Sequence, residues 1–368
     1  MVSPYPVPPP RPSDPAPTRR YGSIVLLTLG FVLIAVCAVV VTLAVLLSTG
    51  PTSFAIGVLF ALVPVAPLLA FFGWLDRYEP EPRGYLVFAF GWGAAVATLG
   101  SLVINSTSIY LLDTAGRDSE YVGTVFVAPI VEEALKGLGL LTIVWISRRG
   151  LDSVVDGIVY AGLIGVGFAF VENILYLGAA LTDGGSAGLI ATFVARGILS
   201  PFAHPLFTAA FGIGLALAAR NKGAGRLLVL IGYVVAVGLH ALWNANASTD
   251  VTGFLAGFIM IHVPIFLIYV GLALWSRARE GRLIRTHLQP YAATGWVTPA
   301  EVEMLSDLRL RRQALAGAAP GSRSQVRRFQ QSAVSLAHLR ARMDAGSAPR
   351  GGVEMERRLL ADISAQRV

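Results

Sequence analysis

Long apolar segments follow one another along most of the chain, separated by short polar connections. The first runs from Ser23 to about Leu47, and seven more cover residues 53–75, 84–112, 122–147, 153–180, 187–219, 226–246 and 251–276. Each is long enough to cross the hydrocarbon core of a bilayer, which needs about 20 helical residues. The pattern predicts an all-α polytopic membrane protein of about eight transmembrane helices, with a kink at Pro201 in the sixth.

The two ends of the chain follow a different pattern. Residues 1–21 are rich in proline, serine and arginine, which predicts a disordered cytoplasmic tail. After Trp275 charged and polar residues dominate, and Thr298 and Glu301 have the spacing of a capping box around a proline. Two helices are expected in this part, from 298 to about 314 and over 323–344. The predicted organisation is a tail (1–21), a membrane domain (22–276) and a cytoplasmic helical tail (277–368).

Composition agrees with a membrane protein. Hydrophobic residues make up 55% of the chain and charged residues 14%, whereas a soluble protein carries about a quarter charged residues. The net charge of +7 would suggest nucleic acid in a soluble protein. Here the basic residues lie beside the ends of apolar segments, so we expect a lipid bilayer and no nucleic acid as partner. The single cysteine, Cys37, cannot form an intramolecular disulfide.

Basic residues are distributed unevenly between the connections. With the N-terminus inside, the inner connections hold Arg77 and Arg83, and the C-terminal flank begins with Arg277. The opposite connections hold a single basic residue, Arg117. By the positive-inside rule, this asymmetry predicts a multi-pass protein of the cell membrane with both termini in the cytoplasm.

The fourth apolar segment carries three charged residues, Glu132, Glu133 and Lys136. Such residues are costly within a bilayer, at about 2.5 kcal/mol or more each, and usually mark function. Glu132 and Lys136 are four residues apart and share a helix face, so we expect them to pair. We expect Glu133 to need a different partner.

The fifth and sixth segments carry further ionisable residues. Glu172 lies in the fifth, and Arg196 and His204 flank Pro201 in the sixth. A proline frees a backbone carbonyl one turn earlier, and irregular backbone within a membrane is tolerated where it is buried or lines water. We expect Arg196 to neutralise one of the glutamates.

His240 and Asn244 lie four residues apart in the seventh segment, on one helix face. This pair suits either a metal ion or a developing oxyanion. Counting the helical rise from the segment ends places Glu132, Glu172 and His240 in the outer half of the membrane. Carboxylates and histidines gathered in one water-accessible cavity can activate water for hydrolysis.

Four motifs carry these residues in order on separate segments: Glu-Glu-x-x-Lys (132–136), Phe-x-x-x-Glu-Asn (168–173), His-Pro-Leu-Phe-Thr (204–208) and His-x-x-x-Asn (240–244). In these motifs, over about residues 55–275, the sequence resembles the PrsW family of intramembrane proteases. That family belongs to a larger group with the CAAX prenyl endopeptidases and bacterial Abi proteins. The resemblance implies hydrolysis of peptide bonds within or beside the bilayer.

The resemblance also implies roles for individual residues. Glu132 or Glu133 would act as the general base on water, and His240 and Asn244 would stabilise the oxyanion. The CAAX-type pattern has a histidine where this chain, like PrsW members, has Glu172. The implied catalytic set is Glu132, Glu133, Lys136, Glu172, His204, His240 and Asn244.

Two chemical models remain open at this point. In one, a zinc ion is held by Glu172, His204 and His240, with Glu133 as the base. In the other, the protein is a metal-free glutamate protease. The resemblance favours the metalloprotease, and it implies a membrane-bound protein substrate, with first-site cleavage of an anti-sigma factor as the candidate role.

Two other classes of function fit parts of the pattern. A proton-coupled transporter would use Glu132, Glu172, His204 and His240 as a relay, but the halves of the chain show no convincing repeat of the kind common in transporters. A non-catalytic adaptor acting through its cytoplasmic tail leaves the polar residues of four segments unexplained.

Overall fold

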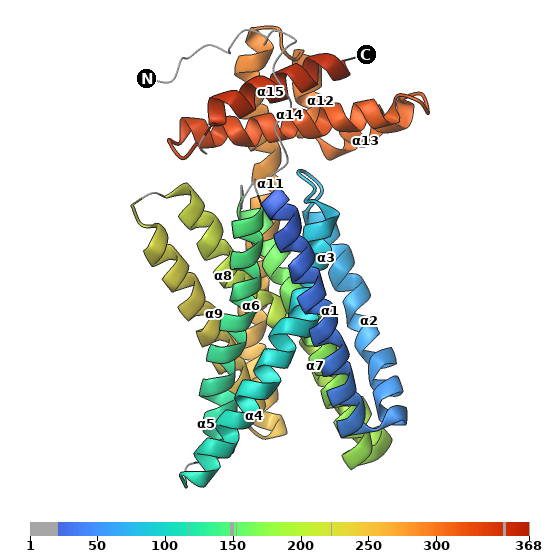
Figure 1. The fold of residues 1–368 in the computed structure, drawn as a ribbon, viewed down its shortest axis with the longest axis vertical. Coiled ribbons are helices and arrows are strands. Elements are labelled where there is room, and N and C mark those ends of the chain that lie inside the picture. The colour runs from blue at the N-terminus through green and yellow to red at the C-terminus, as the bar shows by residue number, and fades with distance from the viewer. Residues whose placement is uncertain are drawn as a thin grey trace.

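The computed structural model describes residues 21–116, 118–147, 151, 153–221, 223–348 and 351–367. Within these ranges the chain is helical and contains no strand. Figure 1 shows a bundle of long helices with a layer of shorter helices across one end, the end at which α1 begins. The predicted N-terminal tail, apart from Tyr21, and Arg117 lie outside the described residues.

In the first half of the bundle, two pairs of helices, α3 with α4 and α5 with α6, continue into one another through short π-helical turns. The elements of this half are α1 (Tyr21–Thr49), α2 (Pro51–Leu75), α3 (Arg83–Gly91), η1 (Trp92–Ala97), α4 (Thr98–Thr114), α5 (Ser119–Val122), η2 (Gly123–Val127) and α6 (Ala128–Ile146). A π-helical turn frees backbone carbonyls from the regular ladder and often occurs at functional sites. The turn η2 precedes the charged residues of α6 directly.

The second half begins with α7 (Val154–Phe193), which is two helices joined at Gly185. The elements that follow are η3 (Val194–Leu199), α8 (Ala203–Arg220), α9 (Gly225–Ala247), α10 (Val251–Gly257), η4 (Phe258–His262) and α11 (Val263–Ala293). The helical path stops between Leu199 and Ala203, which confirms the interruption predicted at Pro201.

Six helical runs in the described residues are long and apolar enough to cross a membrane. About eight were predicted, and the difference has two sources. The run Val154–Ala219 contains both the fifth and the sixth predicted segments. The fourth predicted segment corresponds to α5, η2 and α6, and the three charged residues of α6 distinguish it from a uniformly apolar span. The count of eight stays a prediction.

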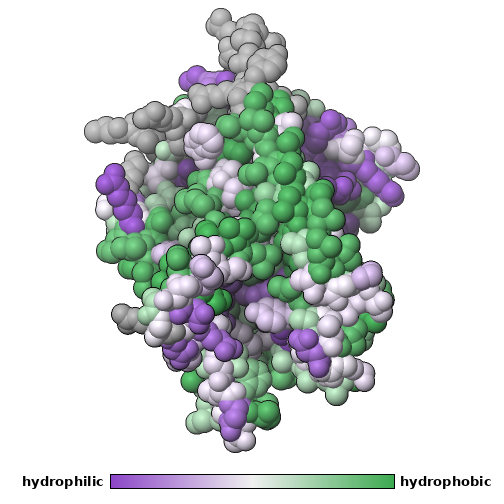
Figure 2. Space-filling view, turned by 60° about the horizontal axis from the view of Figure 1, so that its bottom comes forward, coloured by the Kyte–Doolittle hydropathy of each residue, from purple (hydrophilic) through white to green (hydrophobic). Residues whose placement is uncertain are grey.

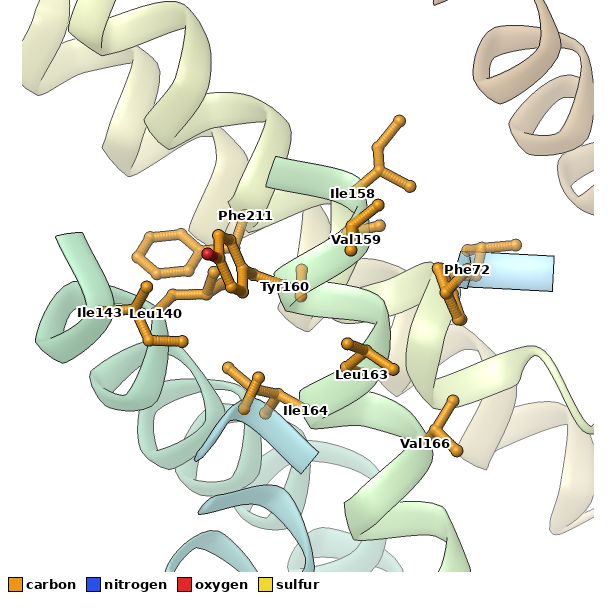
Figure 3. Packing of buried hydrophobic residues seen from close by; sticks show 14 of the residues in the cluster. Phe72, Leu140, Ile143, Ile158, Val159, Tyr160, Leu163, Ile164, Val166 and Phe211 are labelled. Atoms are coloured by element: carbon orange, nitrogen blue, oxygen red, sulfur yellow. The ribbon is translucent and has the colours of Figure 1, made fainter. Parts of the chain in front are cut away.

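Helix α7 forms the centre of the bundle, between α2 and α8, and nearly all its residues from Val155 to Ala169 are buried. Figure 3 shows Tyr160 of α7 beside Phe211 and Leu140, while Phe72 lies across the helix. A Cβ atom added at Gly165 would lie 2.6 Å from the nitrogen of Pro205. Glycine at this position therefore lets the start of α8 lie directly against α7, as small residues do between membrane helices.

The outer surface of the bundle is apolar. Large hydrophobic side chains such as Leu47, Trp145 and Ile268 are more than 70% exposed. In Figure 2, which brings the lower end of the bundle forward, apolar side chains cover its sides and hydrophilic ones gather at its lower end. An apolar surface of this extent is unfavourable in water, at about 25 cal/mol per Å², and a bilayer removes that cost.

The layer across the bundle consists of α12 (Pro299–Ser306), α13 (Leu308–Gly317), α14 (Arg323–Asp344) and α15 (Gly352–Gln366). It has its own hydrophobic core, to which the last turns of α11 contribute Ile284, Leu288 and Tyr291. The capping box at Thr298 and the helix over 323–344 are confirmed. The helix predicted to continue to about 314 instead ends at Ser306, because Asp307 caps a new helix there.

Candidate functional site

The predicted site residues meet inside the bundle from five elements. Helix α6 contributes Glu132, Glu133 and Lys136, while Glu172 comes from α7, Arg196 from η3, His204 from the first turn of α8, and His240 and Asn244 from α9. Glu132, Glu133, Lys136, His204 and His240 are each less than 10% exposed. Residues more than 100 positions apart in the sequence thus share one buried polar cluster.

Lys136 lies at the centre of this cluster and is fully buried. Its Nζ donates to Glu133 Oε1 at 2.8 Å and to His204 Nδ1 at 3.0 Å, and lies 3.6 Å from Glu132 Oε2. The expectation that Glu133 needs a different partner was therefore wrong. Residues three apart also share a helix face, and this pair is the closer one.

Both carboxylate oxygens of Glu133 are engaged by the protein. Besides Lys136, Thr208 donates to its Oε2 at 2.9 Å, and His240 Nδ1 lies 3.1 Å from its Oε1. A carboxylate only accepts hydrogen bonds, so Nδ1 of His240 carries the proton, and Nε2 of that ring is left with a free lone pair. Glu133 therefore fixes the orientation and tautomer of His240.

Glu132 differs because one of its oxygens has no hydrogen-bond donor. Oε1 accepts from Asn105 Nδ2 at 3.2 Å, whereas Oε2 is buried and accepts no hydrogen bond from the described residues, with Lys136 Nζ 3.6 Å away. That oxygen lies 3.7 Å from His240 Nε2. Glu132, His240 and Asn244 line a cavity of about 350 Å³ that Glu133 does not reach. The two residues that carry the free oxygen and the free nitrogen therefore both line a polar cavity within the bundle.

Glu172 takes part in a second set of contacts on the same cavity. Arg196 Nη2 and His204 Nε2 both donate to its Oε2, the latter at 2.7 Å. The guanidinium of Arg196 also donates to Asn173 and lies 4.1 Å from the centre of the Tyr176 ring. The expectation that Arg196 neutralises a glutamate is confirmed, and the glutamate is Glu172.

Asn244 lies on the cavity wall one turn from His240 but does not contact it. Its Nδ2 donates to the backbone carbonyl of Thr124, in the π-helical turn η2, at 2.8 Å. An amide nitrogen has two hydrogens. One is used to hold Asn244 against η2, and the other remains for a group in the cavity.

Three side chains offer ligand atoms close enough to hold one metal ion. Those of Glu132, His204 and His240 all lie within 4.8 Å of one another, so Glu132 stands here in place of Glu172 of the sequence-based set. Oε2 of Glu132, which accepts no hydrogen bond, suits such an ion. His240 suits it too, because its Nδ1–H faces Glu133 and metal-bound histidines usually donate their other N–H to a carboxylate. Both nitrogens of His204 already have partners, Lys136 and Glu172, so His204 would have to release one of them.

Two residues of the cluster had no predicted role. Asn105 lies on α4, within the polar run Asn-Ser-Thr-Ser that interrupts an apolar segment, and that interruption was an available signal. Thr208 was part of a quoted motif, but nothing in the sequence showed that its hydroxyl faces Glu133.

Comparison with protein families places this arrangement among known proteins. A family model described as "PrsW family intramembrane metalloprotease" matches residues 81–273, more than half of the chain. The chain belongs to the PrsW family of intramembrane proteases. All seven predicted catalytic residues and Arg196 lie within the matched region.

Several relatives of this PrsW-family chain carry the name Protease PrsW. That of Geobacillus kaustophilus is 27% identical over 235 residues, which cover 63% of this chain and 93% of the relative. That of Oceanobacillus iheyensis is 25% identical over 225 residues (61% and 96%), and that of Bacillus subtilis 26% over 231 residues (61% and 96%). No solved structure matches the chain. The relatives and the family agree that this is a protease of the membrane.

Proposed function

We propose that this protein hydrolyses peptide bonds of membrane-embedded proteins and that Glu132 is the base that takes a proton from the attacking water. One observation carries the proposal: Oε2 of Glu132 is a buried carboxylate oxygen that accepts no hydrogen bond, and Glu132 lines a polar cavity. A general base needs an oxygen within hydrogen-bond reach of the water it activates. Both oxygens of Glu133 are already engaged by the protein, and Glu133 does not line the cavity.

The remaining residues prepare this centre. Lys136 and Thr208 hold Glu133, and Glu133 holds His240 so that Nε2 faces Glu132. Nε2 can then receive a proton or a metal ion. The unused hydrogen of Asn244 is placed to donate to the oxyanion of the tetrahedral intermediate, a kind of contact worth about 10²–10³ in rate.

We propose that His204 and His240 supply nitrogen ligands to a divalent metal ion such as zinc, which leaves Oε2 of Glu132 available as the base. A bound ion would supply Lewis-acid polarisation of the water and the scissile carbonyl. Metal analysis of the purified protein tests the ligand set. We expect about one equivalent of metal in the wild type and its loss in His240→Ala, and an active preparation free of metal would contradict the assignment.

The topology and the substrate are part of the same proposal. We propose eight spans within residues 22–276, a cytoplasmic tail over 277–368, and both termini in the cytoplasm. In support, α1 begins at the end of the bundle where the C-terminal layer lies (Figure 1). Helix α11 runs without interruption across the boundary at 276, so the tail is attached through a continuous helix. A membrane-bound anti-sigma factor is the candidate substrate that we would examine first, and it rests on the family resemblance.

The experiment compares new protein N-termini by mass spectrometry in cells that carry the wild type, Glu132→Gln or Glu133→Gln. Glu354→Gln, on the exposed face of α15, is the matched control, and expression is equalised. We expect the cleavage product of a membrane protein to be present with the wild type and the control and absent with the two site variants. A set of membrane-protein termini that does not depend on Glu132 would refute the proposal.

A further inference from the structure

Arginine side chains gather in a second cavity, far from Glu132, where the C-terminal layer meets the bundle. This cavity has a volume of about 660 Å³ and lies between the end of α2, the middle of α11 and the helices α12 and α13. Six arginines line it: Arg77, Arg277, Arg285, Arg309, Arg311 and Arg312. The acidic residue on its wall is Asp307, whose side chain accepts from the backbone N–H of Arg309 at 2.6 Å.

Two of the six side chains are fixed by their surroundings. Arg311 is only 7% exposed, and its Nη1 donates to the carbonyl of Tyr78 at 2.7 Å. The guanidinium of Arg277 lies 3.7 Å from the centre of the Trp74 ring, and its Nε donates to the Trp74 carbonyl. These contacts use the stacking face or one edge of each guanidinium and leave further N–H groups for a ligand.

The arginines of this cavity lack the carboxylate partners that others in the C-terminal layer have. Arg340, Arg358 and Arg367 pair with Asp344, Glu354 and Glu301. Within the described residues, none of the six cavity arginines forms an ion pair with a carboxylate. Six like charges around one cavity repel one another, and a bound anion relieves that repulsion.

The chemistry and position of the cavity indicate which anion fits. Guanidinium groups bind phosphate through paired N–H donors and do so better than a point charge. The apolar span Pro51–Leu75 ends beside the cavity at Trp74 and Arg77. Aromatic and basic residues at the end of a span lie at the depth of lipid head groups.

We propose that this arginine cavity is a binding site for a phosphate group. The phosphate belongs either to the head group of an anionic lipid or to a soluble phosphate compound, and both would join α2, α11 and α13 through shared hydrogen bonds. The proposal does not depend on the proteolytic mechanism, because the cavity shares no residue with the site around Glu132.

The test measures the thermal unfolding temperature of the full-length protein in phosphatidylcholine nanodiscs. Phosphatidylglycerol in the disc is one probe, and inorganic phosphate in solution, compared with chloride at equal ionic strength, is the other. The test variant is Arg309→Gln/Arg312→Gln, since both side chains are exposed on α13 and have no acidic partner. The control is Arg357→Gln/Arg358→Gln on α15, outside the cavity, with the same change of charge.

We expect at least one probe to raise the unfolding temperature of the wild type and the control, and the test variant to bind that probe about tenfold or more weakly. A response to phosphatidylglycerol alone assigns the phosphate to a lipid, and a response to inorganic phosphate assigns it to a soluble compound. The proposal would be overturned if neither probe raised the unfolding temperature of the wild type, or if both double variants lost affinity for the probe equally. Should the double variant fail to fold, Arg312→Gln alone provides the same comparison.

Discussion

Two clusters of buried charge lie in different parts of the molecule, one inside the bundle and one where the C-terminal layer meets it. The first contains Glu132 and His240. The second contains Glu79, from the α2–α3 connection, Glu280 of α11 and His338 of α14. Both combine carboxylates with a histidine that is 2% exposed, so residue type and burial do not distinguish them.

What distinguishes the clusters is the distance between the charged groups and access to a cavity. His338 Nε2 lies 3.0 Å from Glu280 Oε2 and 3.2 Å from Glu79 Oε2, and Ser335 donates to Glu79 at 3.1 Å. None of these residues lines either polar cavity. Glu132, in contrast, lines such a cavity, and the nearest basic nitrogens lie farther from its Oε2, at 3.6 Å (Lys136 Nζ) and 3.7 Å (His240 Nε2). A buried charge cluster that faces a cavity can act on a ligand there, whereas one without a cavity fastens two parts of the fold.

The largest expected difference between the clusters is in catalytic rate. Glu132→Gln should lower the rate of substrate cleavage by about 10²–10⁴-fold, the usual contribution of a general base. Glu79→Gln should leave the rate per folded molecule within about twofold of the wild type, a difference too small to reflect a catalytic group. The substrate identified by its new N-terminus provides the assay, with folded protein quantified by size-exclusion chromatography. Similar losses in both variants would remove the distinction.

The next effect concerns stability. Lys136→Met leaves two buried carboxylates without their cation, which typically costs about 3–5 kcal/mol in free energy of unfolding. Arg358→Gln breaks an exposed pair on α15 and should cost less than about 1 kcal/mol. Equilibrium unfolding in bicelles measures both. A loss below about 1 kcal/mol for Lys136→Met would mean that the ion network of α6 does not hold the site together.

The smallest expected effect is a pH dependence of the junction cluster. Burial alone would lower the pKa of His338, but the carboxylates of Glu79 and Glu280 outweigh it and raise the pKa to about 10. Because the pKa is higher in the folded state, this stabilisation is complete below about pH 6.5, the ordinary value, and is lost as pH rises to about 10. Limited proteolysis of the C-terminal layer should therefore become faster over that range, and His338→Gln should abolish the trend.

The sequence predicted the architecture well where a local pattern determines it. Apolar length located the membrane helices, and the capping box at Thr298 located the start of α12. Contacts between distant segments were less predictable. Helical spacing alone allows Lys136 to reach either glutamate. Only the packing of α8 and α9 shows that Thr208 and His240 engage Glu133, while Glu132 lines a cavity.

The candidate metal ligands were the least predictable part of the site. Sequence order cannot show that Arg196 folds back onto Glu172 or that Asn105 approaches Glu132 from α4. Arg196 neutralises Glu172, whereas Oε2 of Glu132 accepts no hydrogen bond. For this reason Glu132, and not Glu172, appears among the candidate metal ligands of the structure.

The most direct test of the central claim asks whether water reaches one cluster and not the other. Ser101 on α4 lines the cavity of Glu132, while Ser276 lies one turn before Glu280, and both are buried with a hydroxyl that has no partner among the described residues. Each is changed to cysteine in a Cys37→Ser background and exposed to a charged thiol reagent in permeabilised membranes. We expect Ser101→Cys to react and Ser276→Cys to react only after unfolding. An inert Ser101→Cys, or equal reactivity at both positions, would contradict this expectation.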